Sequence, residues 1–154
     1  MNTVDLDAGE DPLDPGSIVR WARQRDLAAD LAMRERLVEF REALRDWIGA
    51  GGDPPPEPVR TMINELDLVV RADGERLRLT SPYPFGAALA PVVDAVRTAI
   101  DDGRWRRLKS CDRMRCRWVF YDHSKNAASR WCAASICGAR EKARRAHARR
   151  SRGG

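Results

Sequence analysis

The sequence lacks any long run of apolar residues, and its acidic first residues contain no apolar core. A membrane-spanning helix needs about 20 consecutive apolar residues, and a secretory signal needs a shorter apolar run. We therefore expect a cytoplasmic protein that does not span a membrane. The sequence also shows no glycine-rich phosphate loop, no nucleophile–base set and no carboxylate pair at a spacing typical of catalysis. We accordingly expect no enzymatic activity.

Cysteine and histidine are scarce, with four cysteines and two histidines among 154 residues. All four cysteines lie between Cys111 and Cys137, as C-x4-C, a gap of fifteen residues, and a second C-x4-C. Two close pairs separated by a short loop are typical of a zinc site with four thiolate ligands. The spacing predicts one Zn²⁺ per chain, held by Cys111, Cys116, Cys132 and Cys137.

Other interpretations of these cysteines are two disulfides, a redox pair or four free thiols. Disulfides need an oxidising compartment, and the N-terminus gives no sign of secretion. The four-residue knuckles are longer than the usual two. Zinc is favoured over an iron–sulfur cluster because nothing in the sequence indicates redox work. Four protein ligands fill the coordination sphere, so the site should be structural, with His123 as a less favoured substitute ligand.

Charge is divided unevenly along the chain. Residues 104–154 carry a net charge of +13, whereas residues 1–103 carry −8. Such asymmetry suggests a basic, polyanion-binding end on an acidic body. A basic tail that only keeps the protein soluble is the alternative, but here the excess is fused to the cysteine segment.

The first hundred residues show the apolar spacing of helices and one hairpin. From Leu27 to Ile48, apolar residues recur every three or four positions, which predicts the longest helix. We expect shorter helices at 17–25, from Pro58 onward, and at 85–102. The core face of the last is predicted to hold Leu89, Val92, Val93, Val96 and Ile100. Residues 68–70 and 76–80 predict a hairpin with Leu77 and Leu79 turned inward.

The cysteine segment should contain its own small elements. We expect strands at 117–122 and 129–132, a turn near 123–126, and a helix from about Ser135 to Arg149. The core of this segment is predicted to hold Trp118, Phe120 and Trp131. Alanine and arginine are strong helix formers, and a basic helix fits a DNA major groove or a row of phosphates. The predicted nucleic-acid contacts are Arg117, Lys125, Arg130, Arg140, Lys142, Arg144, Arg145 and Arg149.

Residues 107–150 resemble the CGNR zinc finger, a bacterial module. The matching features are the C-x4-C knuckle, the aromatic strand 117–121 ending at Asp122, Trp131-Cys132, and Cys137-Gly138 followed by Arg140. Ala139 stands where the family has asparagine, so the role of that side chain is lost here. The resemblance implies a zinc-binding module, and its metal ligands do not depend on this position.

The order of elements before the finger is similar to that of the helical ABATE-type domain that precedes CGNR fingers. This resemblance implies a stress-responsive transcription regulator. We therefore expect a mainly α protein with small β-hairpins, in which a C-terminal four-cysteine finger of ββα type follows a helical body. The predicted divisions are a disordered acidic segment at 1–16, the ABATE-like body at 17–106 and the finger at 107–150.

The leading hypothesis is a DNA-binding transcription regulator, with the finger and basic helix contacting DNA and the body serving in sensing or homodimerisation. The alternative is a protein-interaction adaptor whose finger docks on the transcription machinery or another acidic partner. A zinc-linked redox sensor and an RNA-binding protein also stay open. Which arginine reads a base, if any, is not visible in the sequence.

Overall fold

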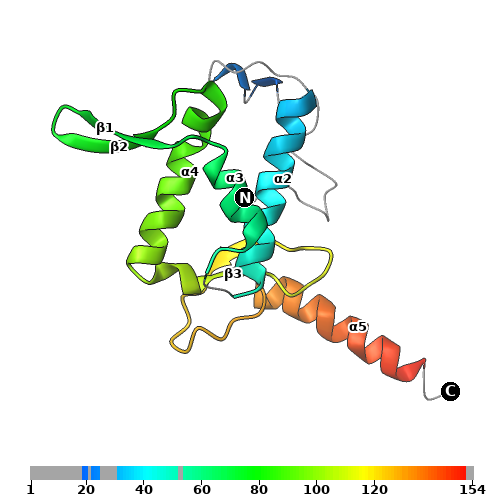
Figure 1. Cartoon of the computed structure of the whole chain (residues 1–154). Coiled ribbons are helices and arrows are strands. Elements are labelled where there is room, and N and C mark those ends of the chain that lie inside the picture. Colours follow the sequence, from blue (N-terminus) through cyan, green and yellow to red (C-terminus); the bar gives the residue numbers. More distant parts are fainter. Residues whose placement is uncertain (1–18, 21, 25–30, 52–53, 152–154) are drawn as a thin grey trace.

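A computed structural model of the protein describes residues 19–20, 22–24, 31–51 and 54–151 (Figure 1). The predictions for residues 1–16, most of 17–25 and the first turn of the helix from Leu27 lie outside these residues. The described elements, in chain order, are α2 (Leu31–Gly49), α3 (Glu57–Asn64), β1 (Val69–Asp73), β2 (Arg76–Thr80), α4 (Pro84–Asp101), the 3₁₀ turn η1 (Arg104–Arg107), β3 (Leu108–Ser110), β4 (Val119–Tyr121), the π-helical turn η2 (Ala134–Gly138) and α5 (Ala139–Arg150).

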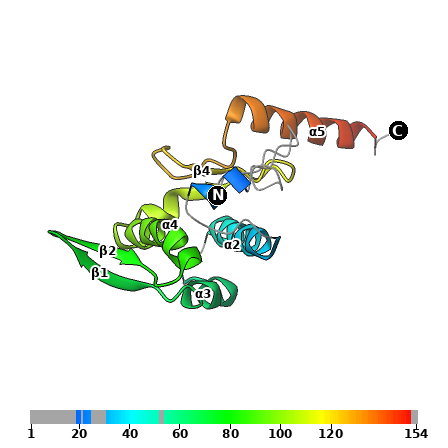
Figure 2. The same cartoon turned by 90° about the horizontal axis from the view of Figure 1, so that it is seen from above.

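Helices α2, α3 and α4 surround the main core, as the view from above shows (Figure 2). The apolar stripe of α2 faces this core through Leu37, Phe40, Leu44 and Trp47, which confirms the predicted helical spacing. Of the predicted α4 face, Leu89, Val93 and Val96 are buried and Ile100 is half-buried, but Val92 is exposed. None of the helices in the described ranges has the length and apolarity required to cross a membrane.

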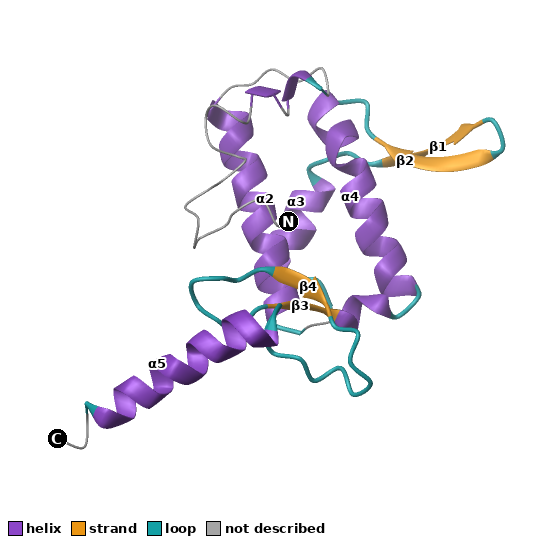
Figure 3. Ribbon diagram, turned by 180° about the vertical axis from the view of Figure 1, so that it is seen from behind, coloured by secondary structure: helices purple, strands orange, loops and turns teal. Residues whose placement is uncertain are grey.

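Strands β1 and β2 form the predicted antiparallel hairpin, with Ala72 opposite Leu77 and Val70 opposite Leu79. The base of the hairpin packs on α4, and its tip extends away from the helices (Figures 1 and 3). The inward placement of Leu77 was therefore wrong, because its side chain is 76% exposed. Alternation identifies the apolar face of a hairpin, but only Leu79, near the base, is close enough to the core to pack against it.

The second hairpin differs from the predicted one. Strand β4 pairs antiparallel with β3, so that Leu108 lies opposite Tyr121 and Ser110 opposite Val119. The amide of Cys111 donates to the Trp118 carbonyl at 2.9 Å, which closes the hairpin around the first cysteine pair. The predicted partner strand at 129–132 is not a strand. It contacts the hairpin edge through one backbone bond, from the Asp112 amide to the Arg130 carbonyl.

The cysteine segment shares its core with the helical body. Trp105 and Val119 are buried in the same cluster as Leu44 and Val96, and β3 packs against α2. Trp118 was predicted in the core, but its side chain is 38% exposed. Side chains alternate along a strand, so the inward turn of Val119 places Trp118 on the other face. The mainly α fold with two small hairpins is confirmed, and the finger is packed on the body without a flexible linker.

Candidate metal centre and basic helix

The four cysteine sulfurs meet at one point. All four Sγ atoms lie within 4.8 Å of one another, and none of the four cysteines is in a disulfide. The Cys116 and Cys132 sulfurs are 3.6 Å apart, and those of Cys132 and Cys137 are 3.7 Å apart. A tetrahedral zinc with bonds of about 2.3 Å to sulfur requires neighbouring sulfurs about 3.8 Å apart. The donor set and its spacing therefore fit one Zn²⁺.

The first knuckle is a tight turn between Cys111 and Cys116. The Arg113 carbonyl accepts the amides of Cys116, at 2.8 Å, and of Arg117, at 3.2 Å. Arg117 then adopts a left-handed backbone conformation with φ of 48°. This conformation is uncommon for residues other than glycine, and it reverses the chain directly after the ligand so that β4 can run back along β3.

The second knuckle is the π-helical turn η2. The Ala133 carbonyl accepts the amides of Cys137, at 2.8 Å, and of Gly138, at 3.3 Å. Gly138 lies against the ring of Trp131, where a Cβ atom would come within 3.3 Å of the ring carbon Cε3. The close approach favours glycine at this position and holds the start of α5 against the segment that carries Cys132.

The two knuckles are also joined outside the sulfur cluster. The Asp112 amide donates to the Arg130 carbonyl at 2.9 Å, and the Arg130 Nε donates to the Asp112 carboxylate at 2.6 Å. Asp112 follows the ligand Cys111, and Arg130 stands two residues before the ligand Cys132. The double contact therefore helps to bring one ligand of each pair to the same place.

Burial and local amides act in opposite directions on the thiols. Burial raises the pKa of the Cys111 thiol, but hydrogen bonds from the backbone N–H groups of Cys132 and Arg113 and from the side chains of Cys132 and Cys116 together lower it, and the net pKa is below the usual value. Burial raises the pKa of Cys116 to about 11 and raises that of Cys132 well above its ordinary value. Zinc binding must therefore displace protons from Cys116 and Cys132.

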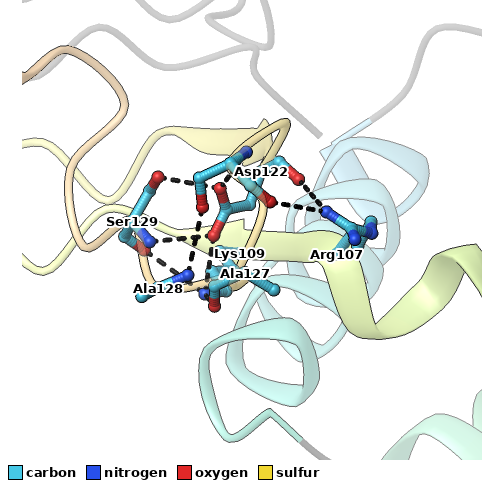
Figure 4. A network of polar contacts seen from close by, with 7 residues as sticks. Arg107, Lys109, Asp122, Ala127, Ala128 and Ser129 are labelled. Carbon is cyan, nitrogen blue, oxygen red and sulfur yellow. Dashed lines mark hydrogen bonds and ion pairs between the residues drawn. The ribbon is translucent and has the colours of Figure 1, made fainter.

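A buried carboxylate organises the loop between β4 and the second knuckle (Figure 4). Asp122 is 1% exposed and accepts the amides of Ser124 and Ser129, both at 2.9 Å, and the Ser129 hydroxyl at 2.7 Å. The Lys109 ammonium lies 2.9 Å from the same carboxylate. These donors, led by Lys109, lower the pKa of Asp122 far below its usual range.

Two cations of β3 and η1 hold the same loop at its carbonyl groups. Lys109 also donates to the Ala127 carbonyl, and Arg107 donates to the carbonyls of Asp122, at 3.0 Å, and Ser124, at 2.9 Å (Figure 4). The loop is consequently fixed on the finger hairpin by charge-assisted hydrogen bonds. The sequence shows Asp122 only as the end of the aromatic strand, and we predicted no role for it. The aspartate between an aromatic strand and a serine-rich loop was the available signal.

The match to a known family covers this segment. Residues 107–150 match the CGNR zinc finger. The matched residues contain both knuckles, the Asp122 loop and α5, and we call them the CGNR finger. No curated protein matches the chain. The identity of the body as an ABATE-type domain remains a prediction.

Helix α5 continues directly from η2 and projects away from the rest of the protein (Figures 1 and 3). None of its residues is buried. It carries the predicted contacts Arg140, Lys142, Arg144, Arg145 and Arg149, and also Arg150. Glu141 pairs with Arg144 at 2.7 Å and with Arg145 at 3.0 Å, and these two arginines lower its pKa to about 2. Lys142 and Arg149, seven positions apart, lie on one face of the helix.

The remaining predicted contacts lie elsewhere on the CGNR finger. Lys125 is exposed on the Asp122 loop. Arg130 is paired with Asp112, and Arg117 is paired with Asp46 and, at 3.5 Å, with Glu42 of α2. The structure thus brings the α5 cations together, but it directs Arg117 to the body. The His123 ring lies against Tyr121, with centroids 4.8 Å apart and ring planes tilted by 58°, and is not part of the metal-ligand cluster.

Proposed function

We propose that the protein is a zinc-dependent DNA-binding transcription regulator that contacts DNA through the CGNR finger and α5. The observation that carries this proposal is the surface of α5. It has no buried residue, and among its twelve residues it has six lysines and arginines and one acid. A helix in which the structure buries no residue, and which carries such a charge, is suited to a polyanion.

Zinc would give this helix a fixed direction. Cys137 lies at the end of the turn that leads into α5, and Gly138 packs on Trp131. The helix therefore starts two residues after a candidate metal ligand, so that its first turn is tied to the body through the knuckles. A helix enters the major groove of DNA, which is about 12 Å wide, and arginine and lysine bind phosphates and guanine edges there. Lys125 on the Asp122 loop would contact the neighbouring backbone.

The helical body would serve in sensing or homodimerisation. The three-helix core and the β1–β2 hairpin lie on the side of the molecule away from α5 (Figure 1). A body in this position leaves α5 open to DNA, and two copies joined through their bodies would present two finger units to one duplex. The oligomeric state, measured by light scattering, tests this part of the proposal.

The DNA-binding proposal is tested by anisotropy titrations of a labelled duplex with the full chain at several salt concentrations. We expect a log–log salt slope that indicates several phosphate contacts, since each contact adds about 0.9. The double variant Lys142→Gln, Arg149→Gln should reduce the slope by about two and weaken binding strongly. The matched control is Arg71→Gln, Arg76→Gln, which removes two exposed cations from the β1–β2 hairpin.

Equal effects of the two double variants would show that binding follows net charge alone and would overturn the role of α5. No binding at low salt would overturn DNA binding itself. An RNA duplex and a single strand, titrated in parallel, separate RNA recognition from DNA recognition.

A second candidate function, the protein-interaction adaptor, is favoured by apolar side chains on the finger surface. Met114, Trp118 and Ile136 are all exposed. Apolar side chains in the open are used more often for contacts with proteins than with phosphates. Trp118→Ser and Ile136→Ser together should abolish an adaptor interaction and leave the salt-dependent DNA binding unchanged, so the two functions are distinguishable.

A further inference from the structure

A groove of about 540 Å³ lies between the C-terminal half of α2 and the proline-rich segment that leads into α3. Its floor includes Trp47 of α2 and Val59 of α3, and the rings of Pro54, Pro56 and Pro58 line the opposite side. The volume lies within the range of about 300–1,000 Å³ that is typical of sites for one small molecule. The groove is predominantly apolar, so it favours an occupant with an apolar body.

The polar residues of this groove are all acidic. Glu39, Glu42 and Asp46 line it from one stripe of α2, and no lysine or arginine is among its lining residues. Positions three and seven apart on a helix share a face, so the three carboxylates stand along the same edge. The Glu39 carboxylate makes no hydrogen bond or ion pair with any residue in the described ranges, and the residue is exposed. Charge complementarity thus favours a cationic occupant.

The other two carboxylates are shared with the CGNR finger. Arg117 lies against Asp46 and 3.5 Å from the second carboxylate oxygen of Glu42. The first carboxylate oxygen of Glu42 accepts hydrogen bonds from Arg41 at 2.8 Å and from Arg45 at 2.7 Å. Both arginines are buried on the core side of α2. The left-handed backbone of Arg117, directly after the ligand Cys116, directs its guanidinium to this edge. A cation in the groove would therefore compete with a finger residue that adjoins the zinc knuckle.

We infer that the groove between α2 and the segment 54–58 is a binding site for an apolar organic cation that competes with Arg117 for Glu42 and Asp46. The apolar walls would hold the body of the molecule, and Glu39 would hold its charge. The inference does not depend on whether the protein binds DNA. It gives the helical body a class of ligand, and Arg117 connects the ligand site to the finger.

The test uses two probes of nearly the same shape and opposite charge, tetraphenylphosphonium and tetraphenylborate. Each is titrated by calorimetry into the full-length, zinc-loaded protein. We expect saturable binding of the cation at one site and no comparable binding of the anion. Glu39→Gln should weaken cation binding about fivefold, as expected for one partly exposed ion pair. Glu35→Gln is the matched control, because Glu35 is exposed on the same helix and does not line the groove.

Removal of the Arg117 charge should change the affinity for the cation in the opposite direction. Arg117→Gln should tighten cation binding about fivefold, because it removes the resident cation from the two shared carboxylates. Equal binding of the two probes, no binding of the cation, or equal effects of Glu39→Gln and Glu35→Gln would overturn the site. An unchanged or weaker affinity in Arg117→Gln would overturn the competition. If Arg117→Gln fails to retain zinc, Asp46→Asn is measured in its place. This variant leaves the zinc knuckle intact and should weaken the binding of the cationic probe. Unchanged binding by Asp46→Asn would overturn the site.

Discussion

The Trp105 ring lies against the Trp47 ring, with centroids 4.2 Å apart and an angle of 43° between the ring planes. Trp47 belongs to α2, and Trp105 belongs to the 3₁₀ turn that leads into the CGNR finger. Both side chains are buried in the common core. This pair therefore joins the helical body to the finger, across the boundary that the sequence placed between residues 106 and 107.

Replacement of Trp105 should destabilise the whole chain. Trp105→Ala removes a ring that is 4% exposed, and truncation of a buried aromatic side chain costs about 3–5 kcal/mol of unfolding free energy. Urea denaturation, followed by circular dichroism, measures the loss. Met114→Ala is the control, since this finger side chain is 85% exposed and its truncation should cost only about 0.5 kcal/mol. Similar losses for the two variants would contradict the role of Trp105 at the junction.

Loss of one metal ligand should release the finger and weaken the body. Cys132→Ser removes a thiolate, and we expect it to give up zinc to a chelator that the wild-type chain resists. Hydrogen exchange should accelerate across residues 108–138, and also at the end of α2, because β3 packs there. Ser135→Ala, in the same knuckle, should leave both properties unchanged. Full retention of zinc by Cys132→Ser would exclude Cys132 as a ligand.

The affinity for zinc should rise steeply with pH. The raised pKa values of Cys116, about 11, and of Cys132 mean that both thiols are protonated at neutral pH in the metal-free protein. Zinc binds thiolates, so binding releases these protons and is opposed as the pH falls. We expect the logarithm of the apparent association constant to increase by about two or more per pH unit near neutrality. Competition with a chromophoric chelator measures this association constant at each pH. A constant affinity for zinc near neutral pH would contradict the buried thiolate site.

Asp122→Asn should destabilise the finger at neutral pH, because it removes the charge that holds Lys109 and the loop amides. The depressed pKa makes the stabilisation complete above the unfolded-chain value of about 3.9, and it is lost as the pH falls below that value. The gap in thermal midpoint between wild type and variant should therefore be constant between about pH 6 and pH 8 and should narrow below about pH 4. Asp73→Asn, at an exposed ion pair with Arg78 outside the finger, should give a much smaller gap.

The sequence was sufficient to predict those elements whose pattern depends on one dominant physical effect. The spacing of four cysteines predicted the cluster that the structure shows, because a four-thiolate site requires little beyond two short knuckles. The apolar period from Leu27 to Ile48 predicted the helix that the structure describes as α2, because only one face of that helix packs against the core. The basic helix predicted from about Ser135 to Arg149 agrees with α5 at its C-terminal end, but its first residues belong to the π-helical turn η2.

Other features depended on contacts between distant residues. The partner of β4 is β3, in which Leu108 lies opposite Tyr121. This pairing depends on the core, because Trp105 and Val119 pack in it together with residues of α2. The alternation around Leu77 does not indicate how far the hairpin extends beyond α4, on which its base packs. Arg117 was predicted as a phosphate contact on its charge, but its pairing with Asp46 depends on how the finger is packed on α2. Sequence spacing records none of these long-range relationships.

The most direct test of the zinc-held DNA reader is the binding of duplex DNA by one protein sample before chelation, after chelation and after zinc is restored. Anisotropy of a labelled duplex at fixed salt measures all three states. We expect binding that is lost with the metal and recovered with it, because α5 is positioned through Cys137. Unchanged binding by the metal-free chain would show that α5 acts as an ordinary basic tail, and it would contradict DNA recognition by a zinc-ordered finger.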